Sequence, residues 1–150
     1  MKGVPPRFWL VKSEPAAFGW PEQVAHGVEP WTGVRNHQAA AALRAMRQGE
    51  LAFFYHSVTG REIVGVVEVV RTAYPDPTDE GGPWVAVDVR AVAPLPRAVP
   101  LAAMKAEPEL AGFRLLRQSR LSVLEVSLPE WRCLCRLGGL SGPLAEGRSG

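Results

Sequence analysis

The stretch that decides the fold runs from Pro30 to Ser57. It reads Pro30-Trp31-Thr32-Gly33-Val34-Arg35-Asn36-His37-Gln38, continues through an alanine-rich segment, and closes with Leu51-Ala52-Phe53-Phe54-Tyr55-His56-Ser57. A loop that carries Trp, Arg and Asn leads into a helix, and the helix returns the chain to an aromatic strand that ends in a polar pair. This order allows an aromatic wall, hydrogen-bonding groups and positive charge to line one small cavity.

The helix in this stretch has a clear start and a clear buried side. Asn36 is a suitable N-cap for a helix over about residues 37–47, and Gly49 is expected to end it. Four apolar residues follow the i, i+3, i+4, i+7 spacing and are expected to face the core: Ala39, Ala42, Leu43 and Met46.

Apolar and alternating runs on either side of this stretch predict the rest of the fold. Strands are expected over residues 8–11, 51–57, 63–70, 85–91 and 121–126. Short helices are expected over residues 21–25, 102–105 and 128–137, the last with Ser127 and Glu130 as a capping box. Residues 74–83 form a turn-rich connection, and residues 94–108 are rich in proline. The pattern predicts an α+β domain built on a curled sheet or a small barrel.

Length and charge set limits on what the chain can be. At 150 residues it is long enough for one domain with a hydrophobic core and too short for two comfortable ones. Its net charge of +2 does not indicate a globally basic nucleic-acid binder. Residues 31–61, however, hold Glu50 as the one acidic residue against four arginines, which are Arg35, Arg44, Arg47 and Arg61. This imbalance leaves room for a local basic patch.

The sequence also indicates the cellular setting. No signal peptide is recognisable, because Val4-Pro5-Pro6-Arg7 interrupts any apolar run, and no apolar segment is long enough to cross a bilayer. Cys133 and Cys135 stand two residues apart, where helical side chains point in different directions. They are poorly placed to bind a metal together or to form a disulfide with each other. A cytoplasmic location is therefore the expectation.

Five motifs in order give the chain a resemblance to a known family. They are Trp9-Leu10-Val11-Lys12-Ser13-Glu14-Pro15, Trp31-x-Gly33-Val34-Arg35-Asn36-x-Gln38-Ala39, Phe53-Phe54-Tyr55-His56-Ser57, Tyr74-Pro75-Asp76 and Gln118-Ser119-Arg120-Leu121-Ser122-Val123. Together they span about residues 8–137. The chain therefore resembles an EVE domain, a member of the PUA-like superfamily related to YTH readers.

The resemblance implies a fold and a function. The implied fold is a PUA-like mixed β-barrel of five or six strands flanked by short helices, over residues 7–138, with an N-terminal extension (1–6) and a flexible tail (139–150). The implied function is non-catalytic recognition of a modified base, such as 5-methylcytosine, in DNA or RNA. Nucleic acid would be the partner, with no cofactor, metal or membrane involved and with effector proteins encoded separately. One departure is His37, which stands where the family leads us to expect Tyr and supplies a smaller ring.

The candidate ligand-binding residues come from the motifs of this resemblance. They are Lys12, Ser13, Glu14, Trp31, Val34, Arg35, Asn36, Phe54, Tyr55, His56, Ser57, Ser119 and Arg120. Lys12, Ser13 and Glu14 close a strand and offer donors and acceptors to a base edge, or they are a solvated strand end. Trp31 is either a platform in a loop on which a flipped base stacks or a plug for one end of the barrel.

The remaining candidates also have two interpretations each. Arg35 is a possible phosphate clamp at a helix start, whereas Asn36 is at least as simply explained as the cap. Tyr55 and Ser57 share one face of their strand while Phe54 and His56 share the other, and one of these faces must be core. Three arginines recur every third residue before the last strand, as a charged surface or as a stripe of backbone contacts: Arg114, Arg117 and Arg120.

Two other functions stay open on the sequence. In the first, Glu14 and His56 act as an acid–base pair of a nucleotide enzyme, although no nucleophile or metal set accompanies them. The three histidines are too scattered along the chain to suggest zinc-ligand spacing. In the second, the proline-rich residues 94–108 dock a protein partner.

Overall fold

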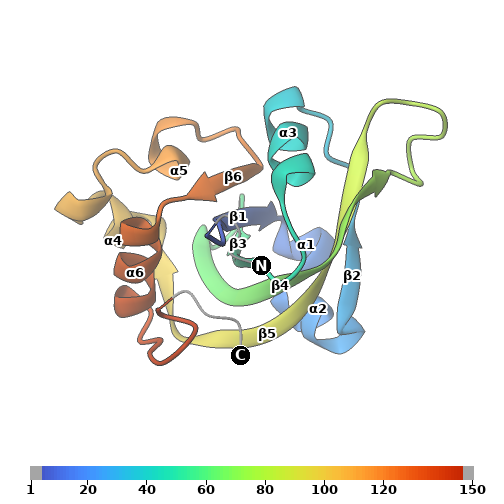
Figure 1. The fold of residues 1–150 in the computed structure, drawn as a ribbon. Coiled ribbons are helices and arrows are strands. Elements are labelled where there is room, and N and C mark those ends of the chain that lie inside the picture. Colours follow the sequence, from blue (N-terminus) through green and yellow to red (C-terminus); the bar gives the residue numbers. More distant parts are fainter. Residues whose placement is uncertain (1–4, 147–150) are drawn as a thin grey trace.

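One curled six-stranded sheet organises the molecule. The computed structural model describes residues 5–146, and its strands follow the order β2-β5-β4-β3-β1-β6. Their bounds are β1 Phe8–Ser13, β2 Val28–Trp31, β3 Leu51–His56, β4 Glu62–Pro75, β5 Val85–Pro100 and β6 Val123–Val126. β1 is parallel to β3 and antiparallel to β6, so the sheet is mixed. The long strands β4 and β5 bend around the molecule (Figure 1), and β2 and β6 are the sheet edges. The predicted α+β class with five or six strands is confirmed, but the sheet stays open between its edge strands β2 and β6 where a barrel was expected.

Short helices flank the sheet. Their bounds are α1 Pro15–Phe18, α2 Trp20–His26, α3 His37–Ala45, α4 Leu101–Lys105, the 3-10 helix η1 Pro108–Leu110, α5 Arg114–Arg117 and α6 Leu128–Leu137. In Figure 1, α4, α5 and α6 gather on one side of the molecule and α2 lies beside β2 on the other. Within the described residues, no helix has the length and apolar character needed to span a membrane.

Two helix starts agree with the sequence prediction. The Asn36 Oδ1 accepts a hydrogen bond from the Ala39 N–H at 2.9 Å and caps α3. Ser127 and Glu130 exchange side-chain and backbone hydrogen bonds of 3.3 and 2.9 Å at the start of α6. The predicted end of α3 at Gly49 is wrong, because the helix ends at Ala45 and Gly49 has a φ of +91° in the following turn.

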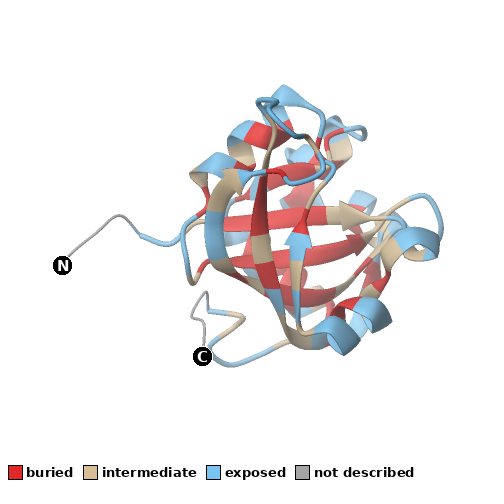
Figure 2. Ribbon diagram, turned by 90° about the vertical axis from the view of Figure 1, so that its right-hand side faces the viewer, coloured by how far each residue is buried: buried red, intermediate tan, exposed pale blue. Residues whose placement is uncertain are grey.

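The core lies on the inner face of the curled sheet and under the helices. Phe53 of β3 stacks on Trp131 of α6 with ring centroids 4.0 Å apart, and Phe8 of β1 stacks on the same indole at 4.9 Å. Figure 2 shows the buried residues running along the strands, with exposed residues on the helices and loops. This packing fixes the ends of β1 and β3 side by side, with Lys12 opposite Tyr55 and Ser13 opposite His56.

Three strands differ from the sequence prediction. β4 continues to Pro75, past its predicted end at residue 70 and into the stretch predicted as a turn-rich connection. Residues 28–31 form the edge strand β2, so Trp31 is paired with Val87 instead of lying in a loop. β5 continues through the proline-rich stretch to Pro100. Proline is acceptable there because β2 pairs only with residues 87–90 of β5, which leaves one edge of the later residues without a strand neighbour.

The chain ends also contact the domain. The Leu144 carbonyl accepts a 2.8 Å hydrogen bond from the Trp131 indole N–H, and the Pro5 carbonyl accepts one of 3.0 Å from Arg47. The flexibility expected for the tail stays a prediction, and residues 147–150 of it lie outside the described residues, as do residues 1–4 of the N-terminal extension.

Candidate nucleic-acid interface

The ends of β1 and β3 form one wall of a cavity. It measures about 520 Å³, within the range of small-molecule sites, and we refer to it as the β1–β3 cavity. Its lining comes from the end of β1, the end of β3 with the loop that follows, and the segment before β6: Lys12, Ser13, Glu14, Tyr55, Ser57, Val58, Arg61, Leu101, Leu115, Ser119, Arg120 and Ser122. Seven of the thirteen candidate residues therefore line one hollow.

Local hydrogen bonds hold the end of β1 in position. The Ser13 hydroxyl donates to the Phe18 carbonyl at 2.5 Å, which ties the strand end to α1. The Ser57 N–H donates to the Ser13 carbonyl at 2.9 Å and so continues the pairing of β1 with β3. Glu14 is exposed at the N-cap position of α1, without a side-chain cap bond. Its carboxylate is thus available at the cavity wall.

The β1–β3 cavity is lined by more cations than carboxylates. Lys12 Nζ donates to the Ser119 carbonyl at 2.8 Å and lies 5.9 Å from the centre of the Tyr55 ring. Burial lowers the pKa of Lys12 and raises the pKa of Tyr55. Arg61 and Arg120 add two guanidinium groups, against the single carboxylate of Glu14. None of these three cations forms an ion pair within the described part of the chain.

A smaller cavity of about 170 Å³ adjoins the first and shares Lys12 and Ser13 with it. Its other walls are mostly apolar or aromatic: Phe18, Glu29, Pro30, Trp31 and Thr32. We refer to it as the Trp31 cavity.

The position of Trp31 corrects the sequence-based expectation. The residue is 7% exposed, and its ring meets Phe54 edge-on at 5.6 Å and Phe18 at 6.3 Å. The indole is therefore packed into the core, although Trp31 contributes to the lining of the Trp31 cavity. A broad open face for stacking, as expected for a loop residue, is not present in this conformation.

A third hollow of about 300 Å³ extends the polar surface toward α3. It shares Ser119 and Arg120 with the β1–β3 cavity and adds Asn36, Gln38, Gln118 and Leu121. The Gln38 and Gln118 amides exchange two hydrogen bonds of 3.1 Å, which joins α3 to the segment before β6. The candidate residues Asn36, Ser119 and Arg120 are thereby brought together.

Four candidate residues line none of the cavities described above. Val34 and Phe54 are buried in the core at 6% and 0% exposure. Arg35 bonds to Asp76 at 3.1 Å and to the Thr78 hydroxyl at 2.9 Å, so it anchors its own loop. His56 faces the other side of β3, where its Nε2 accepts a 3.0 Å hydrogen bond from the Trp20 N–H.

Asp76 is the anchor of the loop that follows β2. Burial alone would raise the pKa of this carboxyl, but hydrogen bonds from Thr78, the Gly33 N–H and Arg35 lower it to about 2. The Tyr74-Pro75-Asp76 motif therefore holds the 33–35 loop in place. This is a structural reason for the motif that does not require contact with a ligand.

The imagined acid–base pair is not assembled. Glu14 lines the β1–β3 cavity, whereas the His56 ring belongs to the opposite face and its Nε2 already has a donor. Burial lowers the pKa of His56, with Glu62 and Glu22 as the carboxylates that act against this shift.

His37 and the two cysteines lie outside the linings of these cavities. His37 packs on Trp84 at 4.7 Å, beyond the lining of the cavities above. Cys133 and Cys135 are both buried, and both are free thiols, in agreement with the prediction that they do not form a disulfide with each other. Cys133 lies near Glu107 and Glu109, but the Arg136 guanidinium donates to Glu109 at 2.8 Å and lies 3.6 Å from the Cys133 sulfur.

Sequence reasoning missed five residues of the β1–β3 cavity, namely Val58, Arg61, Leu101, Leu115 and Ser122. The sequence did point to Arg61 indirectly, because it is one of the four arginines in the unevenly charged residues 31–61. The two leucines carried no such signal, since their helices come to the cavity only through the return of β5 and the turns that follow it.

The curled mixed sheet carries at its strand ends a cavity lined by both charged and apolar side chains, which is an arrangement suited to a small ligand. Comparison with known proteins gives the family. The sequence model of the EVE domain matches residues 7–137. The chain belongs to the EVE domain family. A Rhodopseudomonas palustris protein solved by NMR is 54% identical, with a TM-score of 0.85 and coverage of 89% of this chain and 93% of that one.

Two further structures were solved with nucleic acid. Human THYN1 protein, in complex with 5-methylcytosine-containing DNA, is 32% identical to this chain, with a TM-score of 0.84 and coverage of 91% and 99%. The YTH domain of the Zygosaccharomyces rouxii MRB1 protein, in complex with N6-methyladenosine RNA, is 20% identical, with a TM-score of 0.58 and coverage of 92% and 91%. The likeness to the YTH domain shows a shared fold.

Proposed function

We propose that this domain reads a modified nucleobase of the 5-methylcytosine type in DNA or RNA, without a catalytic step. The observation that carries the proposal is the β1–β3 cavity, whose lining combines Lys12, Arg61 and Arg120 with the carboxylate of Glu14. Three cations and one carboxylate in the same lining suit a ligand that has both phosphates and a base edge. The complex of human THYN1 protein with methylated DNA supports this choice of ligand.

The β1–β3 cavity binds the edge of the base, and the adjoining Trp31 cavity binds its methyl group. Glu14 accepts a hydrogen bond from an exocyclic amine of the base, and the Ser57 hydroxyl donates or accepts beside it. The added methyl group fills the Trp31 cavity, where Phe18, Pro30 and Trp31 supply apolar contact. Burial of one methyl group contributes only about 1 kcal/mol, so discrimination against the unmodified base is modest.

Affinity depends on the cations. Extruding a base from a duplex costs a few kcal/mol, and the largely buried Trp31 offers little stacking in return. Phosphate contacts from Arg61 and Arg120 therefore supply much of the binding, together with Lys12. Arg35 anchors the 33–35 loop, and Arg47 is paired with Glu50 at 3.3 Å, so these two contribute less than their charge alone suggests.

The absence of a catalytic step is supported by His56. Its Nε2 is taken by the Trp20 N–H, and Glu14 lies across the strand from it, so no proton relay connects them. The proline-rich segment proposed as a docking region is largely strand β5 and offers no separate peptide-like segment before Pro100. A role beside separately encoded effectors in the cytoplasm stays a prediction.

The test is a binding panel of short oligonucleotides, plain and 5-methylcytosine-containing, single- and double-stranded, DNA and RNA. Glu14→Ala is expected to weaken binding of the modified strand about tenfold, the loss of one hydrogen bond to a charged group. Glu80→Ala, also exposed and outside the cavity lining, is the matched control. Trp31→Ala is a poor test, because truncating a buried aromatic residue costs about 3–5 kcal/mol of stability. Equal binding of plain and modified strands by the unaltered protein would overturn the proposal.

A further inference from the structure

The loop between β3 and β4 has an unusual backbone. Val58 and Arg61 are the two non-glycine residues with positive φ in the described chain, at +66° and +43°. A β-branched residue in this region is an outlier, because its branched Cβ crowds the backbone. Such outliers persist where the surroundings fix them, and they cluster at sites that hold ligands.

The surroundings of this loop do fix it. The Ser57 N–H bonds to the Ser13 carbonyl at 2.9 Å, and the Thr59 N–H bonds to the Ser57 carbonyl at 2.7 Å. The Leu101 N–H bonds to the Arg61 carbonyl at 2.9 Å and ties the other end of the loop to α4. The loop is thus held at both ends against the walls of the β1–β3 cavity.

Val58 is presented to the outside by this loop. It is 64% exposed, more than any other large hydrophobic residue of the described chain, ahead of Val24 at 53% and Val28 at 47%. A single exposed valine needs no explanation by itself. This one is held in an unfavourable backbone conformation at the wall of the β1–β3 cavity, and its carbonyl accepts a 3.4 Å hydrogen bond from the Arg61 Nε.

We propose that Val58 is a wedge that enters the base stack of a DNA duplex when the modified base moves into the β1–β3 cavity. Apolar side chains are used in this way by proteins that unstack base steps. Arg61 contacts the backbone phosphate beside the gap, and Lys12 and Arg120 hold the strand on the cavity side. The inference rests on the proposed function and narrows its substrate to double-stranded DNA, because a single strand offers no stack to be held open.

The test compares Val58→Asn with Val24→Asn. Asparagine tolerates positive φ, so Val58→Asn keeps the loop and is expected not to lower the melting temperature. Val24 is an exposed valine of α2 outside the cavity lining, and it serves as the matched control. The probes are a short duplex with one 5-methylcytosine flanked by 2-aminopurine, and the same strand alone.

Val58→Asn is expected to bind the duplex about tenfold more weakly, in line with the loss of one buried branched side chain. Binding of the single strand is expected to change by less than about twofold, as for an ordinary surface substitution. Unstacking raises the fluorescence of 2-aminopurine. We expect this rise with the unaltered protein and with Val24→Asn, and we expect no rise with Val58→Asn.

Two outcomes distinguish the proposal that Val58 enters the base stack from the proposal that the domain recognises a modified base. If the unaltered protein prefers methylated strands but Val58→Asn affects the duplex and the single strand equally, or neither, the wedge is wrong and the reader stands. If the unaltered protein shows no preference for methylated over plain strands, the proposed function fails and the wedge fails with it.

Discussion

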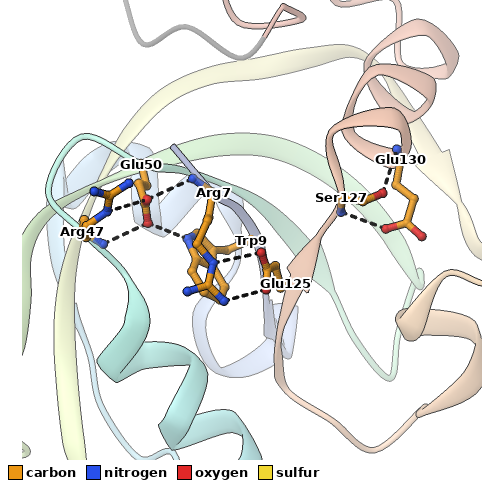
Figure 3. A network of polar contacts seen from close by, with 7 residues as sticks. All are labelled: Arg7, Trp9, Arg47, Glu50, Glu125, Ser127 and Glu130. Atoms are coloured by element: carbon orange, nitrogen blue, oxygen red, sulfur yellow. Dashed lines mark hydrogen bonds and ion pairs between the residues drawn. The ribbon is translucent and has the colours of Figure 1, made fainter. Parts of the chain in front are cut away.

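At the scale of single residues, Glu50 is a buried carboxylate that accepts hydrogen bonds from several donors. Glu50 is 3% exposed and accepts hydrogen bonds from the Trp9 indole N–H at 2.9 Å, the Arg7 N–H at 3.0 Å and the Arg47 N–H at 2.9 Å (Figure 3). It joins the start of β1 to the turn before β3. One side chain thus satisfies donors from three separate positions of the chain.

Glu50→Ala is expected to lower the free energy of unfolding by about 3–5 kcal/mol, because it leaves the buried Trp9 indole N–H and the backbone N–H groups of Arg7 and Arg47 without the carboxylate that accepts from them. Urea denaturation measures this change. Glu80→Ala, exposed in the turn before β5, is expected to change the free energy of unfolding by less than about 0.5 kcal/mol. Similar values for the two variants would show that the Glu50 contacts are of little consequence.

Asp76 makes stability depend on pH. Its folded-state pKa of about 2 lies below the ordinary value of 3.8, so its carboxylate stabilises the fold above pH 3.8 and this stabilisation is lost as the pH falls through 2. Asp76→Asn is expected to cost about 2 kcal/mol at neutral pH, and the difference from the unaltered protein is expected to shrink between pH 4 and pH 2. Urea denaturation across this range is the measurement. A difference that stays constant with pH would contradict the assignment.

At the scale of elements, a glycine lets α2 dock on β4. A Cβ at Gly65 would lie 2.4 Å from the ring of Trp20, which itself meets Phe54 at 5.4 Å. Phe54 in turn supports Trp31 edge-on at 5.6 Å. A series of ring contacts therefore links the packing of α2 to the Trp31 cavity.

Gly65→Ala is expected to destabilise the domain by about 1–3 kcal/mol, because the added methyl group displaces the Trp20 ring. Thermal unfolding measures the loss, and tryptophan fluorescence reports the displaced ring. Gly112→Ala is the matched control, since its added Cβ meets no atom within 4 Å and its φ is not in the positive range. Equal melting temperatures for the two variants would mean that α2 moves aside without cost.

The sequence predicted best those elements that carry local signals such as helix-capping residues. α6 carries a capping box and matches its predicted bounds, and α3 begins at its predicted cap. The edge strand β2 has only four residues, one of them Pro30, and its strand conformation comes from pairing with β5. β5 likewise continues through its prolines because β4 supplies the partner. Tertiary pairing overrode weak local preference in both strands.

At the scale of the whole molecule, charge is distributed more locally than the net value of +2 suggests. The arginines of residues 31–47 are held by protein acceptors: Asp76 for Arg35, the Pro83 carbonyl for Arg44 and Glu50 for Arg47. The cations around the β1–β3 cavity come instead from three separated parts of the chain. Sequence proximity alone did not reveal this grouping, because only the fold brings Lys12, Arg61 and Arg120 together.

Nucleic-acid binding is expected to weaken with added salt, and Arg120→Gln is expected to reduce the slope of log K against log salt concentration by about 1. Fluorescence anisotropy at several salt concentrations gives the slope. Arg132→Gln on the exposed side of α6 is the control and is expected to leave the slope unchanged. A slope unaltered by Arg120→Gln would remove this arginine from the phosphate contacts.

The pairing of β1 with β6 has a consequence for biosynthesis. Arg7 and Glu125, joined by a bidentate contact at this pair of strands, are 118 residues apart. While the chain emerges from the ribosome, the edge of β1 that pairs with β6 stays unpaired until nearly all of the domain has been translated. Long-range closure of this kind slows folding, so a nascent chain stalled before Val123 is the species in which chaperone capture of β1 should be sought.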